Sequence, residues 1–329
     1  PSRGLGDVYK RQKERFFPMN KSKKYILSFV CILFGLLLFF NCIHAARQAQ
    51  PLSDTLGQSY DLRSDYLITQ YADATGQHGT FYTIENSESL IILDGGWSGN
   101  ADAVRSVIAA HDNTVNAWII SHPHQDHAGA FNSIYSDLQG ITIEHLYDNS
   151  FDYDFVETNG EPYDDISVME TYHALTSQTE NLTHLKRGDQ LDICGLTVNV
   201  LNAYDDQVIE NVGGEKDYQN NASLMLRITN QTESLLFCSD IKYDMESFLT
   251  ASIDPELLSC KYLQVGHHGN WSFSEDFYTA SGASVYFFDA PSAITDSPDY
   301  PASALKNSLL SKGKTVLDFS TAPNSVCLK

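Results

Sequence analysis

The chain has 329 residues and a formal net charge of −21, from 21 Lys and Arg against 42 Asp and Glu. This length allows one large domain or two ordinary domains with a sizeable core. Residues 1–46 hold 8 of the basic and 2 of the acidic residues, so the remainder has a charge of about −27. Such an acidic surface repels phosphate backbones and disfavours nucleic acid as a partner.

Three segments precede the globular part of the chain. Residues 1–18 are expected to be non-native, because the run Asp7–Gln12 resembles a translated library adapter. Residues 19–46 combine basic residues, an apolar run and small residues, which is the pattern of a secretory signal peptide. An uncleaved signal anchor is the alternative, although the apolar run is short for a membrane span. We therefore expect a bacterial extracellular or cell-surface protein in which only this segment contacts the membrane. Residues 47–64 are expected to form a linker.

From residue 65 onward, short apolar runs alternate with stretches of helical spacing, which predicts an α/β fold. The first half is expected to contain strands 66–71, 79–84, 90–93, 116–120 and 141–146, and helices 101–110 and 131–138. The second half is expected to contain strands 190–194, 196–202, 222–229, 233–238, 262–265, 284–289 and 315–319. Its expected helices are 244–251, 255–258, 274–280 and 302–311.

Residues 147–180 interrupt this alternation. Between Asp148 and Glu170 there are eight acidic residues and no Lys or Arg. Four aromatic residues are interleaved with them: Phe151, Tyr153, Phe155 and Tyr163. A long insertion of this kind is typical of a substrate lid, and aromatic faces beside carboxylates suit a cationic group such as a quaternary ammonium. The alternative is a solvated acidic loop whose aromatic residues pack inward.

The strongest chemical signal is the run S-H-P-H-Q-D-H-A-G-A at Ser121–Ala130, directly after an apolar strand. It places four metal-ligand side chains within six positions: His122, His124, Asp126 and His127. Imidazoles and carboxylates suit zinc, and less specifically iron or manganese. A His-rich surface loop is the alternative. Further polar residues follow other predicted strands, namely Asp94, Asp240, His267 and His268.

Other residues with possible chemistry show no pattern. Outside the signal segment the cysteines are widely spaced: Cys194, Cys238, Cys260 and Cys327. An exported chain permits disulfides, but buried free thiols are an equal alternative. Three isolated histidines are interpreted as ordinary surface or core residues: His78, His111 and His145.

Taken in order, these motifs resemble the metallo-β-lactamase superfamily. The matching residues are H-x-H-x-D-H at 122–127, D-G-G at 94–96 and the strand-end Asp240. More narrowly, 220–224, Ser239-Asp240 and 265–269 resemble the hydrolase domain of bacterial DNA-uptake channels and secreted phosphorylcholine esterases. The resemblance implies, for residues 65–329, an αββα sandwich of two mixed β-sheets flanked by helices. It also implies a metal site at one sheet edge.

The resemblance further implies two divalent metal ions, with zinc favoured and manganese the alternative. His122 and His124 would bind one ion, Asp126 and His127 would bind the other, and Asp240 would bridge them. Two ions of this kind activate a water molecule near neutral pH and polarise the scissile bond.

Four further residues receive roles from the resemblance. Asp94 and Asn221 would support the metal ligands from behind, as such residues normally do. Asp126 would handle protons, and His267 or His268 would hold the developing oxyanion or protonate the leaving group.

Two departures from the superfamily pattern matter for the metal site. The third histidine of the first metal is missing, and 219–221 reads Gln-Asn-Asn. An Asn or a water could substitute, or His173 or His184 could reach in from the insertion. The late histidine of the second metal is also missing, and 299–301 reads Asp-Tyr-Pro. Either His267 takes over as a ligand, or the Tyr or Asp fills the position.

These observations predict an exported metal-dependent hydrolase that acts on a phosphodiester or ester of a small molecule or cell-envelope component. A metal-dependent nuclease is one alternative, although the acidic charge speaks against it. A non-catalytic binding protein that retains the fold is the other alternative, because a fold does not determine a function.

Overall fold

The computed structural model describes residues 52–161, 164–212 and 216–329. The predicted adapter-derived segment, the signal peptide and the first five residues of the predicted linker, 47–51, lie outside the described residues, as does Tyr163. The rest of the predicted linker, 52–64, contains two short strands. Residues 53–329 form one compact unit that contains both large sheets. Among the described residues, no helix has the length and apolar character needed to cross a membrane.

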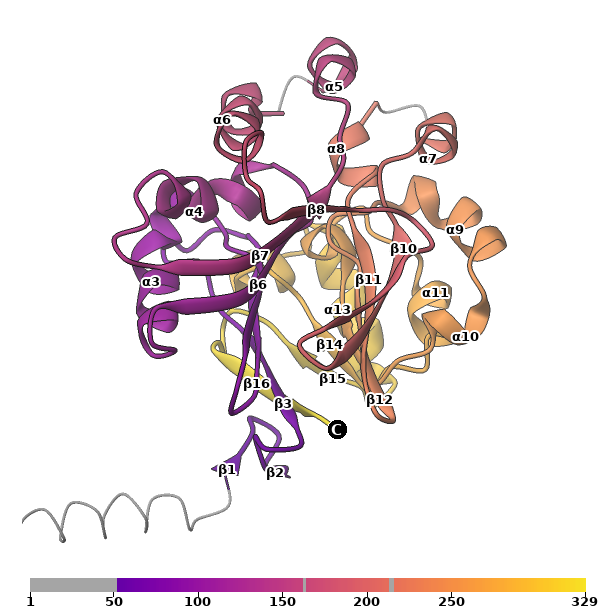
Figure 1. The fold of residues 1–329 in the computed structure, drawn as a ribbon. Helices are drawn as coiled ribbons and strands as arrows, with labels where there is room; N and C mark the ends of the chain where they lie inside the picture. The colour runs from indigo at the N-terminus through magenta and orange to yellow at the C-terminus, as the bar shows by residue number, and fades with distance from the viewer. Residues whose placement is uncertain (1–51, 162–163, 213–215) are drawn as a thin grey trace, which may run out of the picture. The chain divides into compact units, whose positions relative to one another are not determined.

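The first large sheet has seven strands in the order β16-β3-β4-β5-β6-β7-β8 (Figure 1). The strands are β3 (Tyr66–Gln70), β4 (Phe81–Glu85), β5 (Leu90–Asp94), β6 (Thr114–Ile120), β7 (Thr142–Asn149), β8 (Leu182–Leu185) and β16 (Asn324–Leu328). The pairs from β16 to β5 are antiparallel, and those from β5 to β8 are parallel. Because β5 and β6 run in register with Leu93 opposite Ile119, Asp94 and Ser121 emerge side by side.

The second large sheet also has seven strands, in the order β15-β14-β13-β12-β11-β10-β9. The strands are β9 (Gln190–Ile193), β10 (Leu196–Asn202), β11 (Met225–Asn230), β12 (Glu233–Phe237), β13 (Tyr262–Gln264), β14 (Val285–Phe287) and β15 (Thr315–Leu317). The pairs from β12 to β15 are parallel, and the rest are antiparallel. A small separate sheet pairs β1 (Leu52–Ser53) with β2 (Ser59–Tyr60).

Helices cover the outer faces of the two sheets (Figure 1). On the first sheet lie α3 (Ala101–Ala109), α4 (Gln125–Tyr135) and α6 (Ile166–Thr176). On the second lie α9 (Glu246–Ser252), α11 (Glu275–Ala280) and α13 (Pro301–Ser311). The remaining short helices are α5 (Tyr153–Asn159), α7 (Asp206–Asn211), α8 (Tyr218–Asn221), α10 (Pro255–Leu258) and α12 (Ser292–Thr295). Single 3-10 turns are η1 (Ser98–Asn100), η2 (Tyr243–Met245) and η3 (Gly266–Gly269).

Side-chain alternation along the strands builds three hydrophobic layers. In β5, Ile91 and Leu93 point between the sheets, whereas Leu90 and Ile92 point toward α3 and α4. Strands buried on both faces read as continuous apolar runs, which is why Leu90–Leu93 carries no polar residue. The predicted αββα sandwich of mixed sheets is confirmed.

Some predicted elements were wrong. Helix α4 begins at Gln125 and not at residue 131, so Asp126 and His127 lie in its first turn. The polar residues of the motif favoured the prediction of a loop. An acidic side chain such as Asp126, however, stabilises the N-terminal turn of a helix. Gly129 permits close packing of this helix, because a Cβ there would lie 2.6 Å from the Ser98 nitrogen. Strands β8 and β16 were not predicted.

The insertion is helical and not an irregular loop, since it contains α5 and α6. Its aromatic residues pack inward: Phe151 is buried, and the Tyr153 ring stacks on His173 with centroids 4.1 Å apart. All four cysteines of the described part are free thiols, three of them buried.

Candidate metal centre

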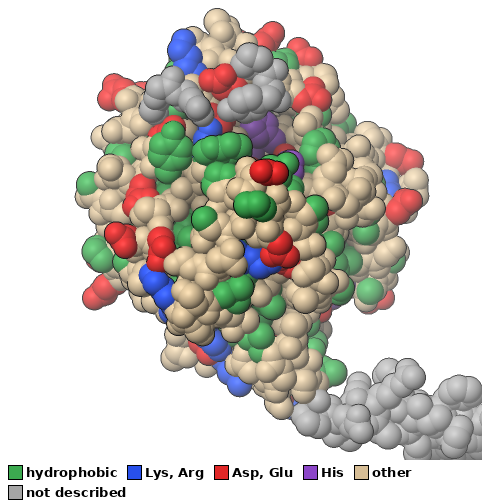
Figure 2. Space-filling model, turned by 180° about the vertical axis from the view of Figure 1, so that it is seen from behind, with side chains coloured by type: hydrophobic (Ala, Val, Ile, Leu, Met, Phe, Trp, Pro, Cys, Tyr) green, Lys and Arg blue, Asp and Glu red, His purple; other side chains and the backbone are tan. Residues whose placement is uncertain are grey.

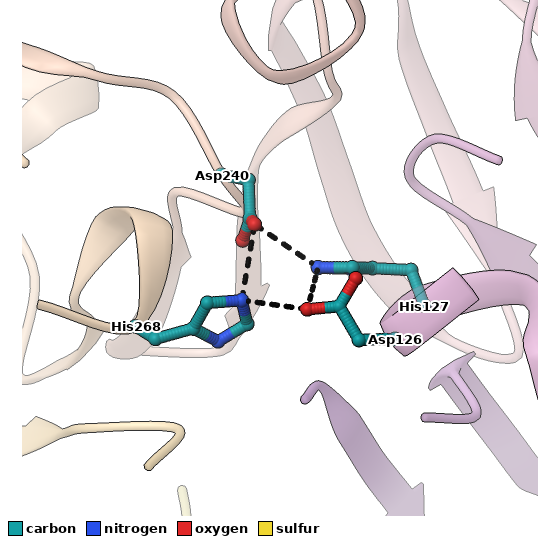
Figure 3. Close-up of side chains that lie close together, drawn as sticks. All are labelled: Asp126, His127, Asp240 and His268. Atoms are coloured by element: carbon teal, nitrogen blue, oxygen red, sulfur yellow. Dashed lines mark ion pairs between the residues drawn. The ribbon is translucent and has the colours of Figure 1, made fainter. Parts of the chain in front are cut away.

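The ends of several strands and one helix bring four ligand side chains together (Figure 3). Asp126 and His127 come from the start of α4, Asp240 follows β12, and His268 lies in η3 after β13. One ligand atom of each lies within 4.8 Å of the others, and all four residues are buried. We call these four residues the metal cluster. It joins elements of both sheets, because the ends of β6 and β12 lie at the same edge of the sandwich.

Distances within the metal cluster are short. His127 Nε2 lies 3.2 Å from Asp240 Oδ2, and His268 Nε2 lies 3.1 Å from both Asp240 Oδ2 and Asp126 Oδ2. Nevertheless, His127 Nε2, Asp240 Oδ1 and both His268 nitrogens lack an aligned hydrogen-bond partner among the described residues. Buried polar atoms are normally satisfied, so these atoms are arranged for another group. Two imidazoles and two carboxylates in this arrangement fit a divalent ion such as zinc.

Charges in the cluster offset one another in the metal-free protein. Burial alone would lower the pKa of His268, but Asp240 and Asp126 outweigh it and raise the pKa to about 10. Burial would raise the pKa of Asp240, but His127 and His268 hold it well below its usual value. The carboxylates thus favour positive charge between them, and a divalent cation would supply that charge in place of imidazole protons.

His122 and His124 form a second pair of facing ligands beside the cluster. His122 Nε2 lies 3.1 Å from His124 Nδ1, and the rings of His122 and His127 have centroids 4.1 Å apart. Burial, followed by the neighbouring His127 and His124, lowers the pKa of His122 well below its usual value. A neutral imidazole is the form that binds a metal.

Asp94, predicted to support the metal ligands, lies behind the motif. Its carboxylate accepts hydrogen bonds from Ser121 N at 2.7 Å, Ser121 Oγ at 2.8 Å and His127 Nδ1 at 2.8 Å. Because Nδ1 of His127 donates to Asp94, Nε2 is the nitrogen left for the cluster. Asn221 is also buried, and its Oδ1 accepts from the backbone nitrogen of Lys242 at 3.0 Å, two residues after Asp240.

The structure corrects the assignment of His267 as a metal ligand, because His268 occupies the cluster instead. Both residues have left-handed backbone conformations, with φ of 47° and 56°. In this tight turn His267 is directed to Asn270, whose carbonyl accepts from His267 Nδ1 at 2.6 Å. His267 still lines the adjoining cavity of about 200 Å³.

The alternative ligands from the insertion and the late segment do not reach this cavity. His173 and His184 line a separate cavity of about 520 Å³, where His184 Nδ1 lies 2.6 Å from Asp148 Oδ1. Tyr300 is 40% exposed and lies next to the first residue of α13. The residues that do line the cavity over the cluster are His78, His124, Gln125, Asp126, Asn220, Asp240, His267 and His268.

Two residues of the site were missed by sequence reasoning. His78 was interpreted as an ordinary residue, but its Nε2 lies 3.4 Å from Asp126 Oδ2 and burial lowers its pKa to about 4. Asp164 of the insertion lies 2.6 Å from His124 Nε2 and is buried. Neither residue has a sequence signal, because both reach the site only through tertiary packing. The other two isolated histidines lie outside it, and His111 pairs with Glu85 at 2.7 Å.

Comparison with known proteins supports the superfamily assignment of one segment. The family model described as "Metallo-beta-lactamase superfamily" matches residues 74–163, which include Asp94 and the His122–His127 motif. The two mixed sheets between helix layers agree with the metallo-β-lactamase fold. No curated protein matches this chain in sequence.

Solved structures of this fold are similar at low identity. YhfI of Bacillus subtilis, a metallo-β-lactamase fold protein, is 12% identical with a TM-score of 0.48, over 80% of this chain and 99% of that one. Igni18, a metallo hydrolase of Ignicoccus hospitalis, is 12% identical with a TM-score of 0.46 over the same shares. CmlA, a diiron β-hydroxylase of Streptomyces venezuelae, is 12% identical with a TM-score of 0.48, over 81% of this chain and 54% of that one.

Proposed function

We propose that this protein is an exported, metal-dependent hydrolase of the metallo-β-lactamase superfamily. Its substrate would be a phosphodiester or ester of a small molecule or a cell-envelope component. The observation that supports the proposal best is the buried metal cluster, in which several ligand atoms lack an aligned hydrogen-bond partner among the described residues. Buried histidines and carboxylates with strongly shifted pKa values at the floor of a cavity are typical of catalytic centres.

Two ions would share the site. Asp126, His127, Asp240 and His268 would hold one, and His122 and His124 would hold the other, with Asp240 between them. When bound, divalent ions supply Lewis acidity to the scissile group and an acidified water. Zinc suits the cluster best, because its donors are imidazole nitrogens and carboxylate oxygens.

Residues of the chain would manage the protons. His267 Nδ1 donates to the Asn270 carbonyl, so Nε2 is the ring nitrogen that can exchange a proton with the substrate. Burial lowers the pKa of His267, which keeps the ring neutral near pH 7. Asp126 lies within 3.4 Å of His78 Nε2 and would pass a proton at its Oδ2.

Size and charge restrict the substrate. A cavity of about 200 Å³ suits a small head group and not a packed polymer segment. Acidic side chains are spread over the face in Figure 2, on which histidines are also visible. Together with the charge of about −27, this favours a neutral or cationic group over nucleic acid. The phosphocholine-type substrate of the esterase relatives is one such group. Export, by way of residues 19–46, belongs to the same proposal, with a signal-anchored form as the alternative.

The direct test is turnover of a chromogenic phosphodiester by the purified protein with zinc or manganese. Hydrolysis should depend on added metal and should be lost in Asp240→Asn, whereas the exposed-site control Asp102→Asn should retain it. No turnover with any divalent metal would contradict the proposal. Degradation of single-stranded DNA would favour the nuclease. Less than one metal ion per chain, unchanged in His122→Ala, would favour the non-catalytic binding protein.

A further inference from the structure

The cavity over the metal cluster contains a residue with no assigned role, Asn220. It lies in α8, where the superfamily pattern has a histidine and this chain reads Gln219-Asn220-Asn221. Asn220 is 2% exposed and lines the same cavity as His124 and Asp240. The fold therefore brings this amide to the metal centre although the sequence lacks the usual ligand there.

The orientation of the Asn220 amide is determined by its neighbour. Asn220 Nδ2 donates to Asp217 Oδ2 at 2.9 Å, and a carboxylate can only accept. Lys242 Nζ lies 3.1 Å from the same Asp217 oxygen, and this ion pair holds that carboxylate in place. The carbonyl Oδ1 of Asn220 is thereby turned away from Asp217. It is buried and has no hydrogen-bond partner among the described residues.

A buried acceptor left in this state is destabilising unless another group satisfies it. The nearby histidine pair offers two ring nitrogens that face each other. His122 Nδ1 already contacts Ser121 Oγ at 3.1 Å, and His124 Nε2 contacts Asp164. The remaining nitrogens face each other at 3.1 Å, close to the roughly 3.3 Å expected for two ligands of one tetrahedral zinc-sized ion.

We propose that Asn220 Oδ1 is the third protein ligand of the first metal position, completing a set of two imidazoles and one amide oxygen. An amide oxygen is a harder donor than an imidazole nitrogen. This position should therefore favour manganese or ferrous iron more than a position with three histidines would. The inference rests on the proposed function only in requiring that the site binds metal. His173 and His184 do not compete, since they line the separate cavity.

The test compares the metal affinities of the full chain and four variants, by calorimetry and elemental analysis with Zn²⁺ and Mn²⁺; His122→Ala serves as the reference for loss of one ion. Asn220→Ala should lower the affinity for one of the two ions about tenfold or more and leave the affinity for the other unchanged. Asn220→His should bind zinc at this position at least about tenfold tighter and lose preference for manganese. The d–d absorption of the Co²⁺ form should also change in Asn220→His. Asn211→Ala, an exposed amide on α7, should behave as wild type.

Three results would overturn the inference. If Asn220→Ala and Asn220→His both keep wild-type affinities while His122→Ala loses one ion, Asn220 is not a ligand, although the proposed function stands. If Asn220→His binds zinc more weakly than wild type, the side chain does not face the ion. If the wild-type chain binds no divalent ion, the proposed function fails together with this inference. Should Asn220→Ala not fold, Asn220→His alone distinguishes these outcomes.

Discussion

Replacement of Asp94 by Asn isolates the contribution of one buried negative charge to the metal centre. Asp94 is fully buried and has a left-handed backbone with φ of 55°, which Asn tolerates better than other residues. The substitution therefore retains shape and backbone. An Asn can still accept from Ser121 N through Oδ1 and donate to Ser121 Oγ, but its amide nitrogen then faces His127 Nδ1. The proton on His127 Nδ1 loses its acceptor.

The expected magnitude follows from that single lost bond. A buried donor without a partner costs about 1–3 kcal/mol of unfolding free energy. In a domain of this size that corresponds to a decrease in Tm of roughly 2–12 °C. Loss of a residue that orients a ligand weakens metal binding by about 10–100-fold. Both effects act through His127, so they should appear together.

The measurements are thermal denaturation in chelator and zinc calorimetry, on wild type, Asp94→Asn and the exposed control Asp102→Asn. The control should match wild type in both, because Asp102 lies on the solvent side of α3. Wild-type zinc affinity in Asp94→Asn would refute the role of Asp94 in orienting His127. A decrease in Tm without a change in affinity would limit Asp94 to a structural role.

Three further predictions concern other parts of the molecule. Chelation should lower the Tm, because a bound ion stabilises the fold by about 4 kcal/mol when its free concentration is a thousandfold above Kd. The expected decrease in Tm is roughly 8–16 °C per ion, measured by differential scanning calorimetry. An unchanged Tm would mean that no ion is bound. Asp164→Asn should lower the affinity for the ion at His124 about tenfold and leave the affinity for the other ion unchanged. Stepwise zinc titration measures both affinities, and loss of both ions would contradict this prediction. The hydrogen bond to Asp148 raises the pKa of His184 in the folded state. The pair therefore stabilises the fold fully at pH values below the unfolded-state pKa of about 6.5. This stabilisation is lost as the pH rises through the folded-state pKa. His184→Gln should therefore lower the Tm at pH 5.5 more than at pH 8.5, and an equal difference at both pH values would disprove the linkage.

Strand-end chemistry is the part of the site that could be predicted from sequence. Asp94 and Asp240 each end an apolar run, and parallel strands in register bring such residues to one edge. His78 and Asp164 could not be predicted, because a loop before β4 and a residue between two insertion helices reach the cavity only through packing. His268 could not be separated from His267, since the left-handed turn that directs each ring is a backbone property.

Local structure was predictable where a pattern repeats and unpredictable where tertiary contacts decide. Strand β6 was recognised from its apolar run, whereas the start of α4 was placed six residues late. Its first turn is stabilised by packing, as the Thr80 nitrogen donates to the Asp126 carbonyl at 2.9 Å. The short strand β8 pairs with β7 at the sheet edge and has only four residues, too few for a clear alternation.

Four residues of the metal centre share the left-handed backbone region: Asp94, Ser239, His267 and His268. Non-glycine residues keep such conformations only where the surroundings enforce them, at a cost of about 1–3 kcal/mol each. Here the Ser239 carbonyl accepts from His267 N at 3.0 Å, which locks the two loops to each other. Asp240 and His268 directly follow the two residues joined by this bond, so the backbone itself holds these two ligand positions at a fixed separation.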